Sequence, residues 1–250
     1  MIEFINVCKQ FGSQKILDGL SLSVAKGETC VIVGPSGTGK SVTLRHMIGL
    51  LTPDSGRILV GGEDAVRLTG RKLAALRHRF GVLFQNGALL NWMNVYDNVA
   101  LPLYENTRLP ESEIHRRVSE RLAMVGMTGM EHKMPAELSG GMRKRVGLAR
   151  AIVTDPEIIL YDEPTSGLDP VMSRTIDDLV KELQIRLGVT SVVVTHDLHS
   201  AFAIGDRLVM LSGGKAVFAG TPKEFANSAV PQVREFVEAQ FSGGSLISKD

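Results

Sequence analysis

The chain has 250 residues, of which 44% are apolar and 22% charged, and 28 Lys and Arg against 27 Asp and Glu leave a formal charge of +1 at pH 7. This balance argues against a nucleic-acid binder that works through a basic surface. No apolar run approaches the roughly 18–20 residues that cross a bilayer. Two cysteines cannot form a disulfide framework, and no spaced Cys/His set indicates zinc. We expect one large domain, or a domain with a subdomain, in a reducing cytosol and without a signal peptide.

Strand and helix patterns alternate in the first third of the chain. Ile2–Val7 alternates apolar and polar residues, as in a half-exposed strand, whereas Thr29–Val33 is a continuous run typical of a strand buried on both faces. A helix is predicted from Lys40, followed by dense turn chemistry at 52–56. Phe80–Phe84 is predicted to form another short strand.

The middle of the chain changes character, and the alternation returns after it. Glu111–Val125 has apolar residues at helical spacing, and a second helix is predicted from Ser139. Four more elements are predicted in order: a strand at Glu157–Tyr161, a helix from Pro170, a strand at Thr190–Thr195, and a hairpin of Leu208–Leu211 with Lys215–Ala219. Alternating strands and helices indicate an α/β fold with a largely parallel sheet. The helix-only stretch from about 95 to 150 indicates an inserted or laterally packed subdomain.

Residues 34–41, GPSGTGKS, match the phosphate-binding pattern G-x-x-x-x-G-K-[ST] between a buried strand and a helix. The glycines let successive backbone N–H groups point at phosphate oxygens, and the helix N-terminus adds its positive end. Lys40 is expected to reach the β and γ phosphates, and the Ser41 hydroxyl to coordinate Mg²⁺. The predicted nucleotide-binding residues are Gly34, Pro35, Ser36, Gly37, Thr38, Gly39, Lys40, Ser41 and Val42. The alternative is an ordinary glycine-rich turn.

Two adjacent acids, Asp162 and Glu163, end the apolar run at 158–161. A phosphate-loop enzyme places its Mg²⁺-holding Asp at such a strand tip. A one-residue offset makes the two side chains face different directions. One carboxylate can then serve the metal while the other acts as general base on the attacking water. Alternatively, the acids only cap a strand before Pro164.

A second glycine pair, Gly140-Gly141, follows Ser139. Ser139 can cap a helix there, and the glycines expose the first-turn amides as a second anion site. A single nucleotide hardly needs two such sites on one chain. A nucleotide held between two subunits is therefore the economical interpretation, and an ordinary capped helix is the alternative.

Together these segments resemble the ATP-binding-cassette (ABC) ATPase family over almost the whole chain. Leu138–Met142 is similar to the family's signature motif, with Met at the fifth place where Gln is usual. Further matches are Gln85 with the Q-loop, Ser166–Asp169 with the D-loop, His196 with the switch histidine, and Phe11 with the aromatic residue that stacks on adenine. The resemblance implies a P-loop NTPase with a RecA-like parallel-sheet core, an N-terminal antiparallel β subdomain and a helical signature subdomain at about 90–155. The domain would span 1–242, with a short flexible tail at 243–250.

The resemblance also implies roles for these residues in a head-to-tail homodimer that closes over two ATP molecules. The implied catalytic residues are Glu163 as general base, His196 at the γ-phosphate, Gln85 and Lys40. Ser41, Gln85 and Asp162 would serve Mg²⁺, Asp162 through water. The residues implied to contact the ATP of the other subunit are Ser139, Gly140, Gly141 and Asp169. Met142 removes one side-chain amide from the motif but leaves its backbone amides.

Three classes of ATPase compete on this pattern. A nucleic-acid or ribosome factor of this family usually carries two cassettes or a long coiled coil, and the chain has one phosphate loop and no sustained heptads. A GTPase or other phosphotransferase would not need the segment at 139–141, and a guanine-reading Asn-Lys-x-Asp motif does not occur. The ATP-hydrolysing subunit of a membrane transporter, an importer or an exporter, is the favoured interpretation.

Three segments, at 83–89, 98–103 and 138–152, resemble the ATPase of the Mla-type phospholipid transporter. That resemblance implies transport that maintains outer-membrane lipid asymmetry. The implied partners are an integral permease, an MCE-domain lipid-binding protein and a STAS-domain protein, with no nucleic acid. The chain would lie at the cytoplasmic face of the inner membrane, held there by the permease. Leu90–Met93 departs from the Ser-Leu-Thr-like residues expected there, so the identity of the close relative stays open.

Two apolar segments are candidate interfaces. The segment after Gln85 contains a dense apolar group, and we expect Trp92 or Met93 to be exposed for docking to the membrane partner. Near the C-terminus an amphipathic stripe is formed by Val233, Phe236, Val237 and Phe241. It either reaches a partner subunit or packs on its own domain.

Overall fold

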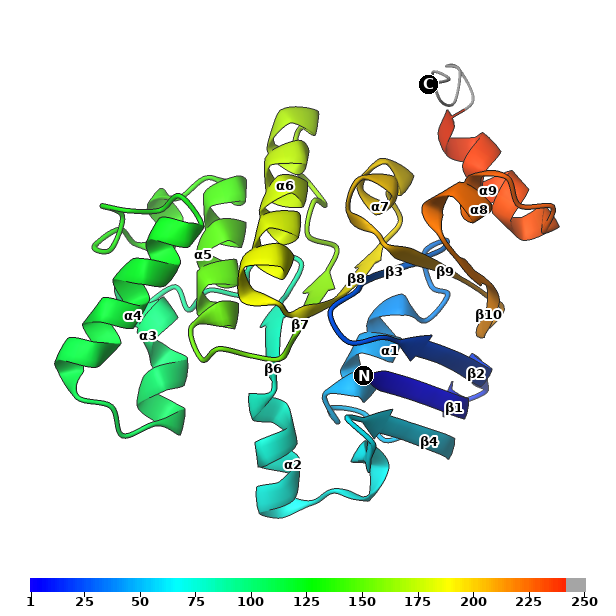
Figure 1. The fold of residues 1–250 in the computed structure, drawn as a ribbon, viewed down its shortest axis with the longest axis horizontal. Coiled ribbons are helices and arrows are strands. Elements are labelled where there is room, and N and C mark those ends of the chain that lie inside the picture. Colours follow the sequence, from blue (N-terminus) through cyan, green and yellow to red (C-terminus); the bar gives the residue numbers. More distant parts are fainter. Residues whose placement is uncertain (242–250) are drawn as a thin grey trace. The chain divides into compact units, whose positions relative to one another are not determined.

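The computed structural model describes residues 1–241, which fall into two compact units (Figure 1). The first unit comprises residues 1–68 and 194–241, and the second comprises residues 69–193. The tail predicted at 243–250 lies outside the described residues. Within residues 1–241, no helix combines the length and the apolar character that crossing a membrane requires.

The first unit begins with an antiparallel sheet in the order β2-β1-β4-β5 (Figure 1). Its strands are β1 (Ile2–Phe11), β2 (Gln14–Val24), β4 (Ser55–Val60) and β5 (Glu63–Asp64). Alternate residues of β1, Ile2 and Phe4, are buried, as the sequence pattern predicts. The strand continues to Phe11, past the predicted end at Val7. Pairing irregularities between Val7 and Gln10 shift the register there and hide the alternation.

The first unit also contains β3 (Thr29–Val33), β9 (Arg207–Ser212) and β10 (Lys215–Gly220), in the order β10-β9-β3. β3 runs parallel to β9, and β9 pairs antiparallel with β10, which confirms the predicted hairpin. Every residue of β3 is buried, as expected for a strand covered on both faces. The helices of this unit are α1 (Lys40–Met47), the 3₁₀ turn η1 (Ala65–Arg67), α7 (Leu198–Ile204), α8 (Pro222–Ala226) and α9 (Pro231–Phe241).

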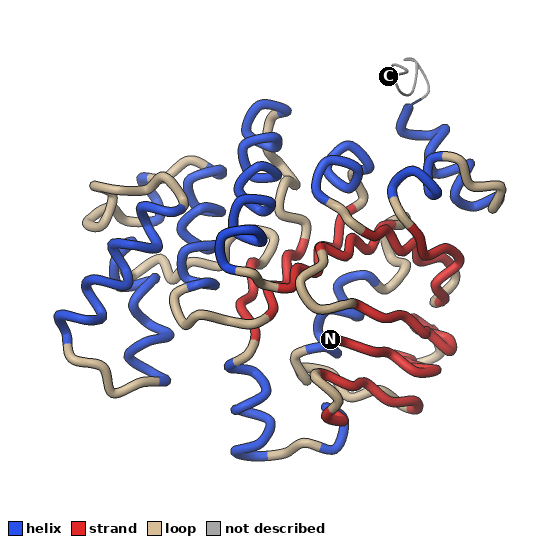
Figure 2. The backbone as a smooth tube through the Cα atoms, in the orientation of Figure 1, coloured by secondary structure: helices blue, strands red, loops and turns tan. Residues whose placement is uncertain are grey.

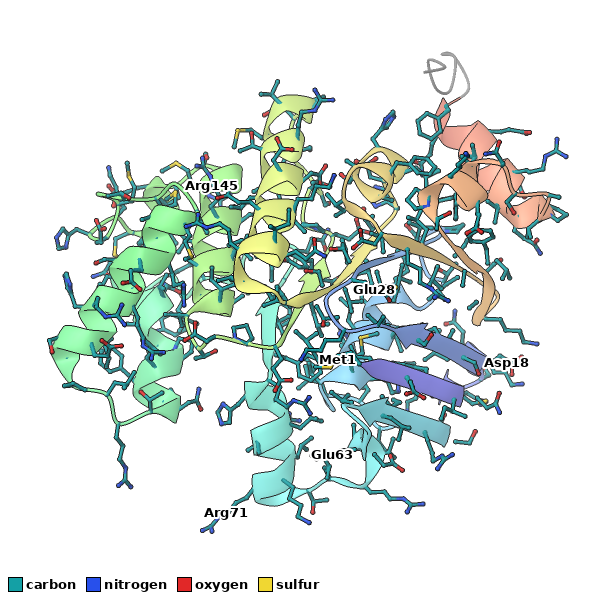
Figure 3. The ribbon with its side chains drawn as sticks, in the orientation of Figure 1. Met1, Asp18, Glu28, Glu63, Arg71 and Arg145 are labelled. Carbon is teal, nitrogen blue, oxygen red and sulfur yellow. The ribbon has the colours of Figure 1, made fainter. Side chains whose placement is uncertain are left out.

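β2 is tied to the β9–β10 turn at Asp18, which Figure 3 labels. The Asp18 amide donates to the Gly214 carbonyl at 3.0 Å, and its carboxylate lies 3.1 Å from the Lys15 ammonium and 3.9 Å from that of Lys215. The hydrogen bond from Lys15 lowers the pKa of Asp18 below its usual value. These links fix the antiparallel sheet to the hairpin.

In the second unit, β6 (Phe80–Leu83) pairs in parallel with β7 (Ile158–Asp162). β8 (Thr190–Thr195) lies on the other side of β7, and its last two residues belong to the first unit. The predicted strands at 80–84 and 157–161 are therefore correct to within one residue at each end. Gly81 is required where β6 meets α5, because a Cβ atom there would collide with the carbonyl of Ala151.

The chain between β6 and β7, all of which the structure describes, forms helices and loops without a strand (Figure 2). Its helices are α3 (Val95–Asn106), α4 (Glu111–Met124), the 3₁₀ turn η2 (Pro135–Glu137) and α5 (Gly140–Ile152). The apolar stripe of α4, including Ile114, Val118 and Leu122, is buried, as its spacing predicts. Two more helices complete the unit, α2 (Gly70–His78) and α6 (Pro170–Leu187).

Candidate functional site

The phosphate loop occupies residues 34–39, between β3 and α1. Gly39 is the N-cap of α1 with φ 96° and ψ 8°, and no side chain caps the helix. The first-turn amides of a helix are unsatisfied within it and attract anions together with the helix dipole. The start of α1 therefore has the geometry of a phosphate cradle.

Two loop glycines are fixed by both their φ angle and close neighbours. Gly34 has φ 147°, and a Cβ atom there would lie 2.5 Å from the Leu211 carbonyl oxygen. Gly39 would place its Cβ atom 2.9 Å from Cδ2 of Leu17. Any side chain at either position would displace the loop from β9 or β2. The antiparallel sheet and the hairpin therefore hold the loop in shape.

Lys40 is 7% exposed, and its ammonium group lies inside the loop. It donates to the carbonyl oxygens of Gly34 at 2.7 Å and Pro35 at 3.0 Å. Thr38 Oγ1 also donates to the Pro35 carbonyl, at 2.9 Å. The loop thus holds a buried ammonium group among its main-chain groups, and the contact of Lys40 with the β and γ phosphates stays a prediction.

In the second unit, Asp162 is the last residue of β7, and Glu163 follows it in a left-handed conformation with φ 50°. Glu163 therefore lies one residue beyond the strand, and the different directions expected for the two side chains stay a prediction. A non-glycine residue at positive φ is uncommon and is retained where surrounding contacts enforce it.

Lys144 of α5 is one of the residues that enforce this turn. Its ammonium group donates to the carbonyl oxygens of Ser166 at 2.6 Å and Glu163 at 3.3 Å. Burial lowers the pKa of Lys144 to about 8, while the charge of Glu163 acts in the opposite direction. Gln85 approaches the same loop, since its Nε2 donates to Ser166 Oγ at 3.2 Å. The structure thus gathers Gln85, Lys144 and the loop that follows β7.

The second glycine pair forms the start of α5. Ser139 is the N-cap, and its Oγ accepts a hydrogen bond from the Met142 amide at 3.2 Å. A Cβ atom on Gly141 would lie 2.5 Å from Cε of Met172, and one on Gly140 would lie 3.5 Å from Cδ2 of Leu168. The capped, glycine-rich helix start predicted from the sequence is therefore present.

Comparison with known proteins decides the family. Residues 17–166 match the family model described as ABC transporter. The chain belongs to the ABC transporter family. It is an ATP-hydrolysing subunit of an ABC transporter, and the predicted family, α/β P-loop fold and ATP binding are confirmed.

The relatives of this ABC ATPase are similar over its whole length. A probable ribonucleotide transport ATP-binding protein, mkl of Mycobacterium tuberculosis, is 46% identical over 249 residues, which cover 100% of this chain and 69% of that protein. The intermembrane phospholipid transport system ATP-binding protein MlaF of Haemophilus influenzae is 41% identical, covering 97% and 92%. The dimeric post-hydrolysis structure of the ATP-binding cassette MJ0796, bound to ADP and Pi, has a TM-score of 0.81 and 33% identity, covering 89% and 99%.

The remaining predicted residues of the ABC ATPase lie at the ends of elements. Phe11 ends β1, is 46% exposed, and has the Lys9 ammonium 5.5 Å from its ring centroid. His196 follows β8 and is exposed. Asp169 is the N-cap of α6, and its Oδ1 accepts from the amides of Val171 and Met172, each at 3.0 Å. Its capping function is therefore shown, and its contact with ATP stays a prediction.

The apolar segment after Gln85 is held by a buried asparagine. Asn98 Oδ1 accepts from the Leu90 amide at 2.8 Å, and its Nδ2 donates to the carbonyls of Leu90, Met93 and Asn94 at 3.1, 3.0 and 2.9 Å. Trp92, within this clamped segment, is 74% exposed, as predicted, while Met93 is half-buried.

The C-terminal stripe packs on its own unit. Val233 and Val237 are buried, and the Phe241 ring lies 4.6 Å from the His199 ring and 6.0 Å from that of Phe202. Of the two interpretations of the stripe, packing on the chain's own domain is therefore correct for residues 231–241.

Two residues that contact the main chain of predicted functional segments gave no separate signal in the sequence. In the second unit Lys144 contacts the loop after β7, and in the first unit Gln240 contacts the main chain beside His196. Both side chains donate to main-chain carbonyls. Every residue type has such a carbonyl, so no pattern in the sequence marks the partner.

Proposed function

We propose that this ABC ATPase powers a phospholipid transporter of the Mla type. The observation that carries the proposal is the end-to-end match with MlaF, which covers 97% of this chain and 92% of MlaF. The mkl protein is more identical, at 46%, but this chain covers only 69% of it. The segments at 83–89, 98–103 and 138–152, which resemble the Mla-type ATPase, add to this match, and ribonucleotide transport is the competing function.

ATP binding by this chain is assigned to the phosphate loop, residues 34–42, with the adenine ring stacked on Phe11. The exposed ring of Phe11 offers the apolar surface that a base needs. Lys40 already carries its charge inside the loop and would turn from the carbonyls of Gly34 and Pro35 to the terminal phosphates of ATP.

The donor atoms proposed for Mg²⁺ suit that ion. Ser41, Gln85 and Asp162 offer hydroxyl, amide and carboxylate oxygens, which are the hard ligands that Mg²⁺ prefers. Gln85 uses its Nε2 on Ser166, so its Oε1 is the atom assigned to the metal. Bound Mg²⁺ would neutralise charge on the phosphates, with Asp162 acting through a water molecule.

Hydrolysis is assigned to Glu163 as general base. Its left-handed backbone is fixed by Lys144, so the carboxylate is held by a rigid turn rather than a free loop end. A positioned base of this kind contributes about 10²–10⁴-fold to a rate. We assign His196 to the γ-phosphate, where its ring would orient the group that is transferred.

We propose that two copies of the chain close head to tail over two ATP molecules. Ser139, Gly140, Gly141 and Asp169 would then contact the ATP held by the other copy. Two features support this: the dimeric MJ0796 cassette is 33% identical, and α5 begins with two glycines after an N-cap serine, a helix start of the kind that attracts anions.

The permease is proposed to dock in a cavity of about 660 Å³ in the second unit. It is lined by residues of α2, β6, the segment after β6, α3 and α5, among them Phe80, Phe84, Leu90, Leu101, Pro102 and Arg150. This mixed apolar lining suits an amphipathic helix of a membrane protein, and the exposed Trp92 lies two residues after Leu90 in the chain. The chain would thus lie on the cytoplasmic face of the inner membrane, with an MCE-domain protein and a STAS-domain protein in the same complex.

The test is purification of the tagged full chain with its membrane complex from its own cells, followed by identification of bound proteins and lipids. We expect a polytopic permease, an MCE-domain protein and bound phospholipid. In reconstituted proteoliposomes, wild-type complex should move phospholipid with ATP, and the Glu163→Gln complex should not. A complex that retains a ribonucleotide, or a permease of another substrate class, would overturn the lipid assignment and leave the ATPase assignment intact.

A further inference from the structure

Gln240, near the end of α9, bridges two main-chain groups beside the switch histidine. Its Nε2 donates to the His196 carbonyl at 2.5 Å, and its Oε1 accepts from the Leu198 amide at 2.8 Å. The partners determine the orientation of the amide, because a carbonyl only accepts and a main-chain N–H only donates. Both ends of one side chain thus hold the chain on either side of Asp197.

The bridged residues form the short link between β8 and α7. Within the link, the Asp197 amide donates to Thr195 Oγ1 at 3.0 Å, and Asp197 Oδ1 accepts from the His199 amide at 2.8 Å. These internal bonds shape the turn, and a further bond reaches the His196 carbonyl from outside the link. Gln240, more than forty positions downstream, supplies that partner.

Packing of α9 on α7 holds Gln240 in place. Phe241, the next residue, lies against the rings of His199 and Phe202, and Val237 is buried one turn earlier. Gln232, at the other end of the same helix, is exposed. The two glutamines of α9 thus differ in environment although they share residue type and helix.

We propose that Gln240 is a positioning residue for His196, through which helix α9 sets the rate of ATP hydrolysis without touching the nucleotide. The main chain sets the Cα–Cβ direction and the rotamers that a side chain can adopt, so a clamp on the His196 carbonyl limits the positions that the imidazole ring can reach. The proposal rests on the proposed contact of His196 with the γ-phosphate. Displacement of a catalytic group lowers turnover more than ground-state binding.

The test compares kcat and KM for ATP of the full-length chain across five forms: wild type, Gln240→Met, Gln240→Glu, His196→Ala, and the double variant Gln240→Met/His196→Ala. Gln232→Met is the matched control. We expect Gln240→Met to lower kcat by about tenfold with KM within about twofold. Gln240→Glu keeps the acceptor for Leu198 but loses the donor to His196, and should lower kcat to a similar extent. The double variant should be no slower than His196→Ala, because Gln240 then has nothing left to position.

The melting temperature of each variant shows whether a low kcat comes from loss of folding or from loss of positioning. If Gln240→Met does not fold, Gln240→Glu still tests the proposal. Equal kcat for both Gln240 variants and Gln232→Met would overturn the proposal, as would a double variant about tenfold slower than His196→Ala. A His196→Ala variant with wild-type kcat would overturn it together with the assigned role of His196. That result differs from failure of the clamp alone, in which His196→Ala is slow and the Gln240 variants are not.

Discussion

Lys144 donates a hydrogen bond of 2.6 Å to the main-chain oxygen of Ser166 and so joins helix α5 to the loop that carries Glu163. The side chain is nearly fully buried, with 4% exposed. One ammonium group therefore links the start of the glycine-rich helix to the turn that presents the proposed base. Because Lys144 contacts main-chain oxygens, it acts on the conformation of the loop.

Replacing Lys144 by Met keeps much of the apolar stem and removes both hydrogen bonds to the loop. Hydrogen bonds made by a charged group contribute about 1.5–3 kcal/mol, and we expect the free energy of unfolding to fall by about that amount. Urea denaturation measures it, with the exposed Lys181→Met as matched control, which should stay within about 0.5 kcal/mol of wild type. Equal stability of the two variants would contradict this role for Lys144.

The same lysine makes stability depend on pH. Burial lowers the pKa of Lys144 to about 8 in the folded chain, from 10.5 when it is exposed. Between these values the unfolded chain binds one proton more, so stability rises with pH in this window. We therefore expect wild type to gain stability relative to Lys144→Met as pH rises from about 8 to 10. A stability difference that stays constant across that range would exclude the lowered pKa.

Asn98 is predicted to hold the segment that presents Trp92. Asn98→Leu removes four hydrogen bonds from a fully buried position and should lower the free energy of unfolding by about 2–3 kcal/mol. Asn106→Leu on the same helix loses one exposed bond and is the control, with an expected change below about 0.5 kcal/mol. Similar stability of the two variants in thermal melts would show that the clamp does not stabilise the segment.

Trp92 reports on the proposed docking of the permease, because it is the only tryptophan of the chain and is 74% exposed. Burial against the partner should move its fluorescence emission to shorter wavelength when detergent-solubilised permease lacking tryptophan is added. Titration at constant detergent concentration measures the shift, and a soluble protein of similar size is the control. Emission that does not change while the complex forms would place the permease elsewhere.

The sequence alone predicts the phosphate loop and its flanking elements well. The reason is local: β-branched residues in Thr29–Val33 and the glycines that follow admit few other structures. The start of α6 is equally clear, since Asp169 caps the helix and Pro170 is its first residue. Both features depend only on neighbouring residues.

Prediction from the sequence fails where the residues of an element depart from the regular spacing of a strand or a helix. β2 was not predicted, because its buried residues Leu17 and Leu20 are three apart and Gly19, at φ 75°, breaks the alternation. α3 lies in the helix-only stretch expected from about 95, but its bounds do not follow from the sequence, since Pro102 lies inside it. The contacts of Lys144 and Gln240 cannot be predicted from the sequence for another reason. Their partners are main-chain groups distant in sequence, which no local pattern marks.

The central claim is that this chain hydrolyses ATP with Glu163 as its general base. The most direct measurement is ATP binding and turnover by the purified full-length chain, as wild type, as Glu163→Gln and as the control Glu182→Gln on the exposed face of α6. We predict that Glu163→Gln binds ATP as wild type does while its turnover falls by about 10²-fold or more. The control should hydrolyse ATP normally. Near-normal hydrolysis by Glu163→Gln would contradict the account.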